Sequence, residues 1–319
     1  MDNKEIKNRL REHYDYVKSL GYEVVAIFLQ GSQNYNLDIY EKDYQSDIDT
    51  KCIIIPTLDD LIKGNHMVST KYDFQGEQID VKDIRVMMEM WKKQNQSYIE
   101  VLFTDYKIIN PKYKELMQDV ISMKNEIAQL NTSQLARCIS GMSKEKVCAL
   151  EHEYPATKQK IDKYGYDPKQ LVSIIRLTHL IENIFDKNLN FKKAMWYDDG
   201  ETRDYMISVK KGKCNLEEAR ELATLYDNKT ESIKNRVVEE FGKENFNDEI
   251  YRKLQKAIYR LVKFGIISSV QEQMHNAWKD VCDSMKYFTK EEQEKEEEII
   301  REMSVEAKEN FFDYYKEEE

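Results

Sequence analysis

The sequence predicts an α+β protein in which a small sheet-containing module precedes an all-α C-terminal region. Three observations predict this class. Strand-like apolar runs occur before residue 112, and beyond it apolar residues recur in steps of three and four, which is typical of helices. Gly and Pro, which disfavour helix interiors, number only 10 and 4 in 319 residues. We therefore predict a first domain over residues 1–112, a helical domain over 113–235 and a helical extension over 236–319.

The first predicted elements are a helix and a buried strand. Apolar residues recur at helical spacing over residues 4–20. Residues 24–30 form a continuous apolar run, which is typical of a buried strand. Gly31 and Ser32 end this strand, and a polar loop continues to Ser46.

In the rest of the first domain, the sequence predicts short elements separated by turn residues. Thr57 suits the N-cap of a helix because acidic residues follow in the first turn. The other expected elements are a strand at 48–56, extended segments at 72–74 and 78–81 joined by a turn at 76–77, a helix at 85–95, and a strand or helix at 97–104.

The second half of the chain predicts long helices. The strongest patterns cover residues 171–185, 216–241 and 249–283. From residue 290 onward Glu and Lys dominate, which predicts a solvated helix face or tail. A shorter basic segment at 210–213 (KKGK) predicts a solvated surface turn.

Composition excludes several functional classes. The 49 basic and 59 acidic residues give a net charge of −10, unlike a globally basic nucleic-acid-binding protein, although a local basic cleft stays compatible with this sum. No apolar run approaches the ~20 residues of a membrane helix. The five Cys form no C-x-x-C pair, and the first residues carry no apolar signal region. We expect a cytoplasmic protein with reduced thiols and no membrane association.

The residues with the clearest chemistry follow the first strand and open the second. Asp47 and Asp49 lie two positions apart, so a strand directs both side chains to one face. Neighbouring carboxylates repel each other and tolerate this spacing best around a divalent cation. Gly31 allows the backbone to approach a phosphate closely, and Ser32 supplies a hydroxyl donor. The alternatives are two solvated acids at a strand start and a plain turn at Ser32.

A third carboxylate, Asp80, lies between the apolar residues Ile79 and Val81. If this segment pairs beside the strand at 48–56, three carboxylates converge, a set that suits one or two Mg²⁺ ions. A single acid on a half-exposed strand is the alternative, and Asp73 and Asp83 lie nearby as substitutes.

These residues carry a resemblance. An apolar strand, Gly-Ser, a loop, Asp-apolar-Asp and a later apolar-Asp-apolar resemble the nucleotidyltransferase superfamily of DNA polymerase β. Within it the chain resembles the RNA-ligase-associated (RlaP-type) predicted nucleotidyltransferases, which read G-S-x-x-Y-G-L before S-D-x-D. Asn36 stands where that family usually has Gly. The matching residues are Gly31, Ser32, Tyr35, Leu37, Ser46, Asp47 and Asp49.

The resemblance continues in the helical region, where family members carry G-Y-D-x-K-H-x-x-H-x-x-R-L. Residues 165–177 match it, except that Gln170 and Ser173 replace both histidines. Lys169 and Arg176 are retained seven residues apart, and hence on one helix face. If that face looks into the cleft, two cations oppose the acids across a triphosphate. A solvated basic stripe is the alternative.

The resemblance covers roughly residues 20–225. It implies a mixed β-sheet backed by helices, with 1–112 as the catalytic domain and 113–235 completing the cleft. It also implies Mg²⁺, as one or two ions that Mn²⁺ can replace, and an NTP donor. In the implied roles, Asp47, Asp49 and Asp80 bind metal, Gly31 and Ser32 hold phosphates, and Lys169 and Arg176 neutralise them.

We therefore expect an Mg²⁺-dependent transfer of NMP from an NTP to a hydroxyl, with release of pyrophosphate. An RNA end is the favoured acceptor. A partner protein that receives AMP is an alternative acceptor, and a nucleotide sensor without turnover is the alternative from another class.

Overall fold

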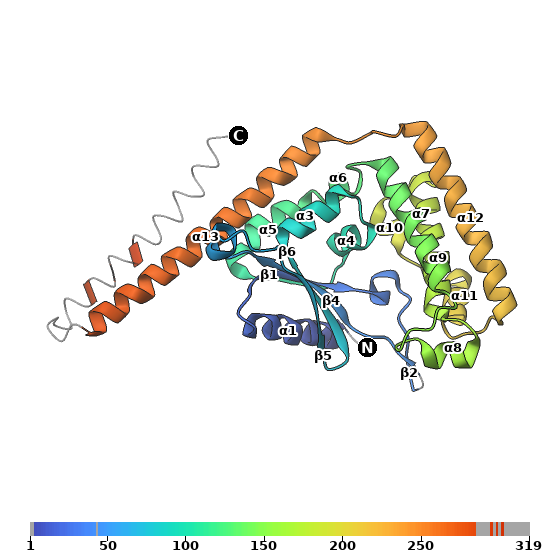
Figure 1. Cartoon of the computed structure of the whole chain (residues 1–319), viewed down its shortest axis with the longest axis horizontal. Helices are drawn as coiled ribbons and strands as arrows, with labels where there is room; N and C mark the ends of the chain where they lie inside the picture. The colour runs from blue at the N-terminus through green and yellow to red at the C-terminus, as the bar shows by residue number, and fades with distance from the viewer. Residues whose placement is uncertain (1–2, 43, 285–293, 296–297, 299–300, 303–319) are drawn as a thin grey trace.

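The computed structural model describes residues 3–42, 44–284, 294–295, 298 and 301–302. A five-stranded mixed sheet and its covering helices precede a helical region (Figure 1), so the predicted α+β class is confirmed. The Glu- and Lys-rich segment from residue 290 lies largely outside the described residues. Within them, no helix is both long and apolar enough to cross a bilayer.

The sheet has the order β5-β6-β4-β1-β7. β4 and β6 are parallel, and the other neighbouring pairs are antiparallel. A separate two-stranded hairpin, β2-β3, stands in the loop after β1. The strands are β1 Glu23–Gln30, β2 Tyr40–Glu41, β3 Tyr44–Gln45, β4 Asp49–Ile55, β5 Ser69–Phe74, β6 Glu77–Asp83 and β7 Lys107–Ile109.

The two faces of the sheet have different partners. Ile27 and Cys52 point to one face, where they pack with Val17 of α1. Phe28 and Ile53 point to the other face and join the larger core. The helices and 3₁₀ turns up to residue 113 are α1 Asn3–Ser19, η1 Ser32–Tyr35, α2 Leu58–Ile62, α3 Ile84–Lys92, α4 Gln96–Ile99, η2 Glu100–Phe103 and η3 Pro111–Tyr113.

The helical region is built on α7, α9 and α12, which pack against one another. The last long helix, α13, returns to lie against α3 and α5 (Figure 1). The predicted division at residue 235 falls inside α12. The remaining elements are α5 Lys114–Ser122, α6 Lys124–Ala128, α7 Thr132–Ala149, α8 Lys158–Tyr164, α9 Pro168–Ile181, the π-helix Glu182–Asp186, α10 Phe191–Met195, α11 Glu201–Lys210, α12 Leu216–Phe241 and α13 Asp248–Ser284.

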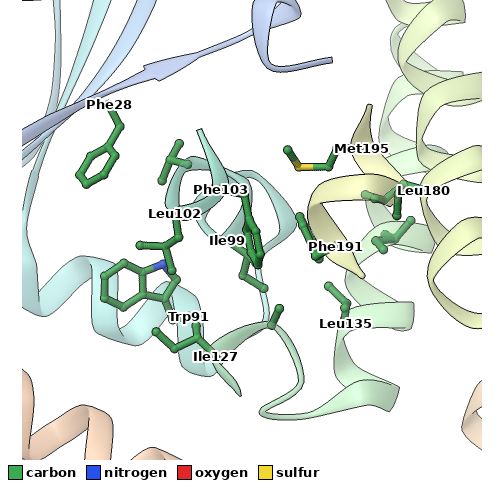
Figure 2. Packing of buried hydrophobic residues seen from close by; sticks show 14 of the residues in the cluster. Phe28, Trp91, Ile99, Leu102, Phe103, Ile127, Leu135, Leu180, Phe191 and Met195 are labelled. Atoms are coloured by element: carbon green, nitrogen blue, oxygen red, sulfur yellow. The ribbon is translucent and has the colours of Figure 1, made fainter. Parts of the chain in front are cut away.

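One apolar core joins the sheet to the helical region. Figure 2 shows Phe28 and Trp91 at the sheet side and Leu180 at the helical side of the same cluster. Phe103 and Phe191 stack between them at a ring-centroid distance of 4.9 Å. Because this packing is continuous, residues on α9 and on the sheet hold fixed positions relative to each other.

The structure resolves one open alternative and corrects one local expectation. Residues 96–103 are helical because Asn95 caps the first turn, with its side chain accepting from Ser97 N. The hairpin between β5 and β6 turns at Gln75 and Gly76, whose φ values are 57° and 84°, and not at 76–77. A non-glycine residue at positive φ gives no sequence signal of its turn.

Candidate functional site

A cavity of about 280 Å³ lies where the end of β1, the start of β4 and the first turns of α9 meet. Of the seven predicted site residues, six line this cavity and Asp80 does not. The six are Gly31, Ser32, Asp47, Asp49, Lys169 and Arg176.

The turn after β1 has the backbone that a close approach to an anion requires. Gly31 has φ 121°, which favours glycine, and it is followed directly by the 3₁₀ turn that starts at Ser32. Asn36 ends this turn with φ 62°, so it adopts the left-handed conformation, which Asn tolerates better than most residues. Gln33 fixes the loop, since its Nε2 donates to Tyr40 Oη at 2.8 Å and to Asp47 O at 2.9 Å.

The Asp47 and Asp49 carboxylates both reach the cavity. Asp49 Oδ1 accepts from Gln78 N at 3.0 Å, and Asp47 Oδ2 accepts from Lys169 Nζ at 3.2 Å. Burial, together with the charge of Asp47, raises the pKa of Asp49, although the Gln78 N–H opposes this. Two oxygen-rich groups whose mutual repulsion a cation would relieve fit one hard divalent ion.

Asp80 lies apart from this pair. It forms ion pairs with Lys51 and with Lys82 Nζ, the latter at 2.7 Å. Burial alone would raise the pKa of Asp80, but the two ammonium groups lower it. The parallel register places Lys51, not Asp49, opposite Asp80 on the neighbouring strand. The expected convergence of three carboxylates is therefore not found, and among the described residues no group of three His, Cys, Asp or Glu side chains could hold a metal ion.

Arg176 lines the cavity beside a buried carboxylate, although its Nη1 forms no hydrogen bond. Its guanidinium lies 4.1 Å from the Tyr35 ring centroid, and Nη1 lies 3.7 Å from Glu100 Oε2. Glu100 is buried and also accepts from Tyr35 Oη at 2.6 Å and from Gln96 Nε2. Sequence reasoning missed Glu100 because residues 97–104 fitted a strand as well as a helix.

Lys210 is the second residue that sequence reasoning missed. The prediction of a solvated turn at 210–213 is wrong for this residue, which is 8% exposed and lines the cavity. It holds for the next one, Lys211, which forms an ion pair with Glu41 at the surface. Helical spacing was the available signal, because Lys210 follows the buried Met206 by four residues.

Neither a protein-family model nor a curated protein sequence matches the chain. Among solved structures, one similar chain is a nucleotidyltransferase-like protein from Exiguobacterium sibiricum 255-15. The two share 11% sequence identity with a TM-score of 0.29, over 74% of this chain and 77% of that chain. A likeness at this level assigns neither an activity nor a substrate to the chain.

Proposed function

We propose that the chain is a nucleotidyltransferase that moves NMP from an NTP to a hydroxyl group and releases pyrophosphate. The observation that carries this proposal is that one cavity brings together the Gly31–Ser32 turn, the Asp47 and Asp49 carboxylates and Lys169. Phosphoryl chemistry of this kind depends on positioning and charge stabilisation, and these groups supply both.

Each residue has a role in the proposal. Asp47 and Asp49 would hold Mg²⁺, which when bound supplies positive charge at the reacting phosphate. The Gly31–Ser32 turn would donate hydrogen bonds to the terminal phosphates. Lys169, whose ammonium lies 3.2 Å from Asp47, would move to the phosphates as the cation replaces it. Asp80 would join the metal site in this proposal only if its ion pairs with Lys51 and Lys82 were broken.

The acceptor is a further proposal, since the residues that line the cavity do not identify it. An RNA end is our first choice, and a protein hydroxyl on a cytoplasmic partner is the second. Both acceptors offer a hydroxyl nucleophile and would receive the same labelled NMP. Which of the two molecules becomes labelled therefore distinguishes them.

The test is incubation of the protein with each α-³²P-labelled NTP, Mg²⁺ or Mn²⁺, and RNA and protein acceptors. We expect label on one acceptor class and a loss of at least about 100-fold in Asp49→Asn, because half of the metal site is removed. Asp59→Asn is the matched control, since Asp59 is an exposed acid paired with Lys63 away from the cavity. Equal activity in both variants would refute the metal assignment.

One observation favours a second candidate, a nucleotide sensor. Lys169 and Lys51 already neutralise Asp47 and Asp80, as they would in a site that binds nucleotide without turnover. Nucleotide binding by the wild-type protein without transfer to any acceptor would support this candidate.

A further inference from the structure

The cavity contains three basic side chains, and their charges are matched to different degrees. Lys169 pairs with Asp47, and Arg176 pairs with the buried Glu100. Lys210 is different, because no carboxylate among the described residues forms an ion pair with it. It is therefore the cavity cation whose charge is left for a ligand.

The hydrogen bonds of Lys210 leave capacity for one more acceptor. Its Nζ donates to Leu37 O at 2.7 Å and to Ser46 Oγ at 3.3 Å. An ammonium group has three donors, so one stays available. The two partners are neutral oxygens that fix the position of Nζ without neutralising its charge.

Burying such a charge without an anion is costly, because burial disfavours the charged form. Burial, and then the positive charge of Lys169, lower the pKa of Lys210 to about 8, although Asp38 and Asp47 partly oppose this. The Tyr44 ring, 5.6 Å from Nζ, is the other group facing it. A polyanion in the cavity would remove this cost.

We propose that Lys210 is a ligand of a polyphosphate group bound in the cavity, beside the Gly31–Ser32 turn. The proposal rests on the proposed function for the source of that group, the triphosphate of an NTP. It assigns the main electrostatic contact to Lys210 and leaves Arg176 as a residue held by Glu100.

The test is calorimetric titration of the full chain with inorganic tripolyphosphate and with ATP, each with and without Mg²⁺. We expect Lys210→Met to weaken both ligands about 10- to 100-fold, because a charge-assisted hydrogen bond in a buried site is lost. Lys211→Met is the matched control and should change affinity less than about twofold, since Lys211 is a surface residue.

Lys210→Arg separates charge from packing. It keeps the positive charge, so we expect it to retain most of the affinity and to abolish the loss of affinity that we expect of the wild type as pH rises above 8. Similar losses in the Met and Arg variants would show that Lys210 only supports the loop, and would overturn the proposal. Wild-type protein that binds neither ligand would overturn it too.

The result is separable from the proposed function. Tripolyphosphate binding that depends on Lys210, in a protein that transfers no label, would uphold this ligand and refute the transferase. Transfer that survives Lys210→Met with unchanged NTP affinity would uphold the transferase and refute Lys210 as a polyphosphate ligand.

Discussion

Acidification should destabilise the protein through His13, a buried residue of α1. His13 is fully buried, with Nδ1 3.0 Å from Thr50 Oγ1 and Nε2 3.0 Å from Glu77 Oε2. Burial keeps the ring neutral at pH 7, so with Nε2–H donating to the Glu77 carboxylate, Nδ1 accepts from the Thr50 hydroxyl. Arg9 binds the same Glu77 oxygen at 2.7 Å and cancels much of its charge.

The magnitude follows from the pKa of His13. Burial, and then the charge of Arg9, lower this pKa from 6.5 to about 4. Between these values the unfolded chain binds more protons than the folded one, so the free energy of unfolding falls as pH falls. The loss is about 2 kcal/mol between pH 7 and pH 5, and about 3 kcal/mol below pH 4.

Urea denaturation at pH 7 and pH 5 measures this loss. His13→Gln should be less stable at pH 7 but lose about 2 kcal/mol less than the wild type on acidification. His66→Gln, at an exposed position, is the matched control and should follow the wild type. If both variants lose as much stability as the wild type, the assignment of the acid response to His13 is refuted.

Two other predictions concern packing and binding. Gly212→Ala should cost about 2–4 kcal/mol of stability, because φ is +78° and a Cβ would lie 2.4 Å from the Tyr164 ring. Gly64→Ala has similar strain at φ +64° with no described atom within 4 Å, so it should cost only about 1 kcal/mol; equal costs in thermal unfolding would contradict the contact with Tyr164. Lys169→Ala should weaken ATP binding about threefold to tenfold, as measured by calorimetry, and unchanged affinity would place Lys169 away from the phosphates.

Local sequence patterns predicted much of the fold. The continuous apolar run of β1 and the helix Leu216–Phe241 were visible because each element carries its own periodicity. The short edge strand Lys107–Ile109 was missed, since three half-buried residues carry no clear period. The hairpin formed by Tyr40–Glu41 and Tyr44–Gln45 was also missed, because strands of two residues carry no period.

Four residues of the candidate site were predictable because they are close in sequence, whereas Lys169 and Arg176, which line the same cavity, were predicted through the family resemblance. Gly31, Ser32, Asp47 and Asp49 lie on one turn and one strand start, and they reach one cavity. Asp80 depends on the register between β4 and β6, which neither strand encodes by itself. Lys210 depends on how α11 packs against a loop 164 residues away, so its burial could not be read from the basic segment around it.

The register between β4 and β6 also explains how β6 holds the start of β4 without placing Asp80 beside Asp47 and Asp49. The first residues of β6 bind residues 48 and 49 at the start of β4. Gln78 N donates to Asp49 Oδ1 at 3.0 Å, and Glu77 Oε1 accepts from Ile48 N at 3.4 Å. Asp80, two residues further along β6, instead serves as counter-ion to the buried Lys51. Removing Asp80 would therefore leave a buried lysine uncompensated, which destabilises a fold by about 3–5 kcal/mol. Loss of activity in an Asp80 variant would then report on folding as well as on metal, whereas Asp49, held by a main-chain N–H, gives the cleaner test of the metal site.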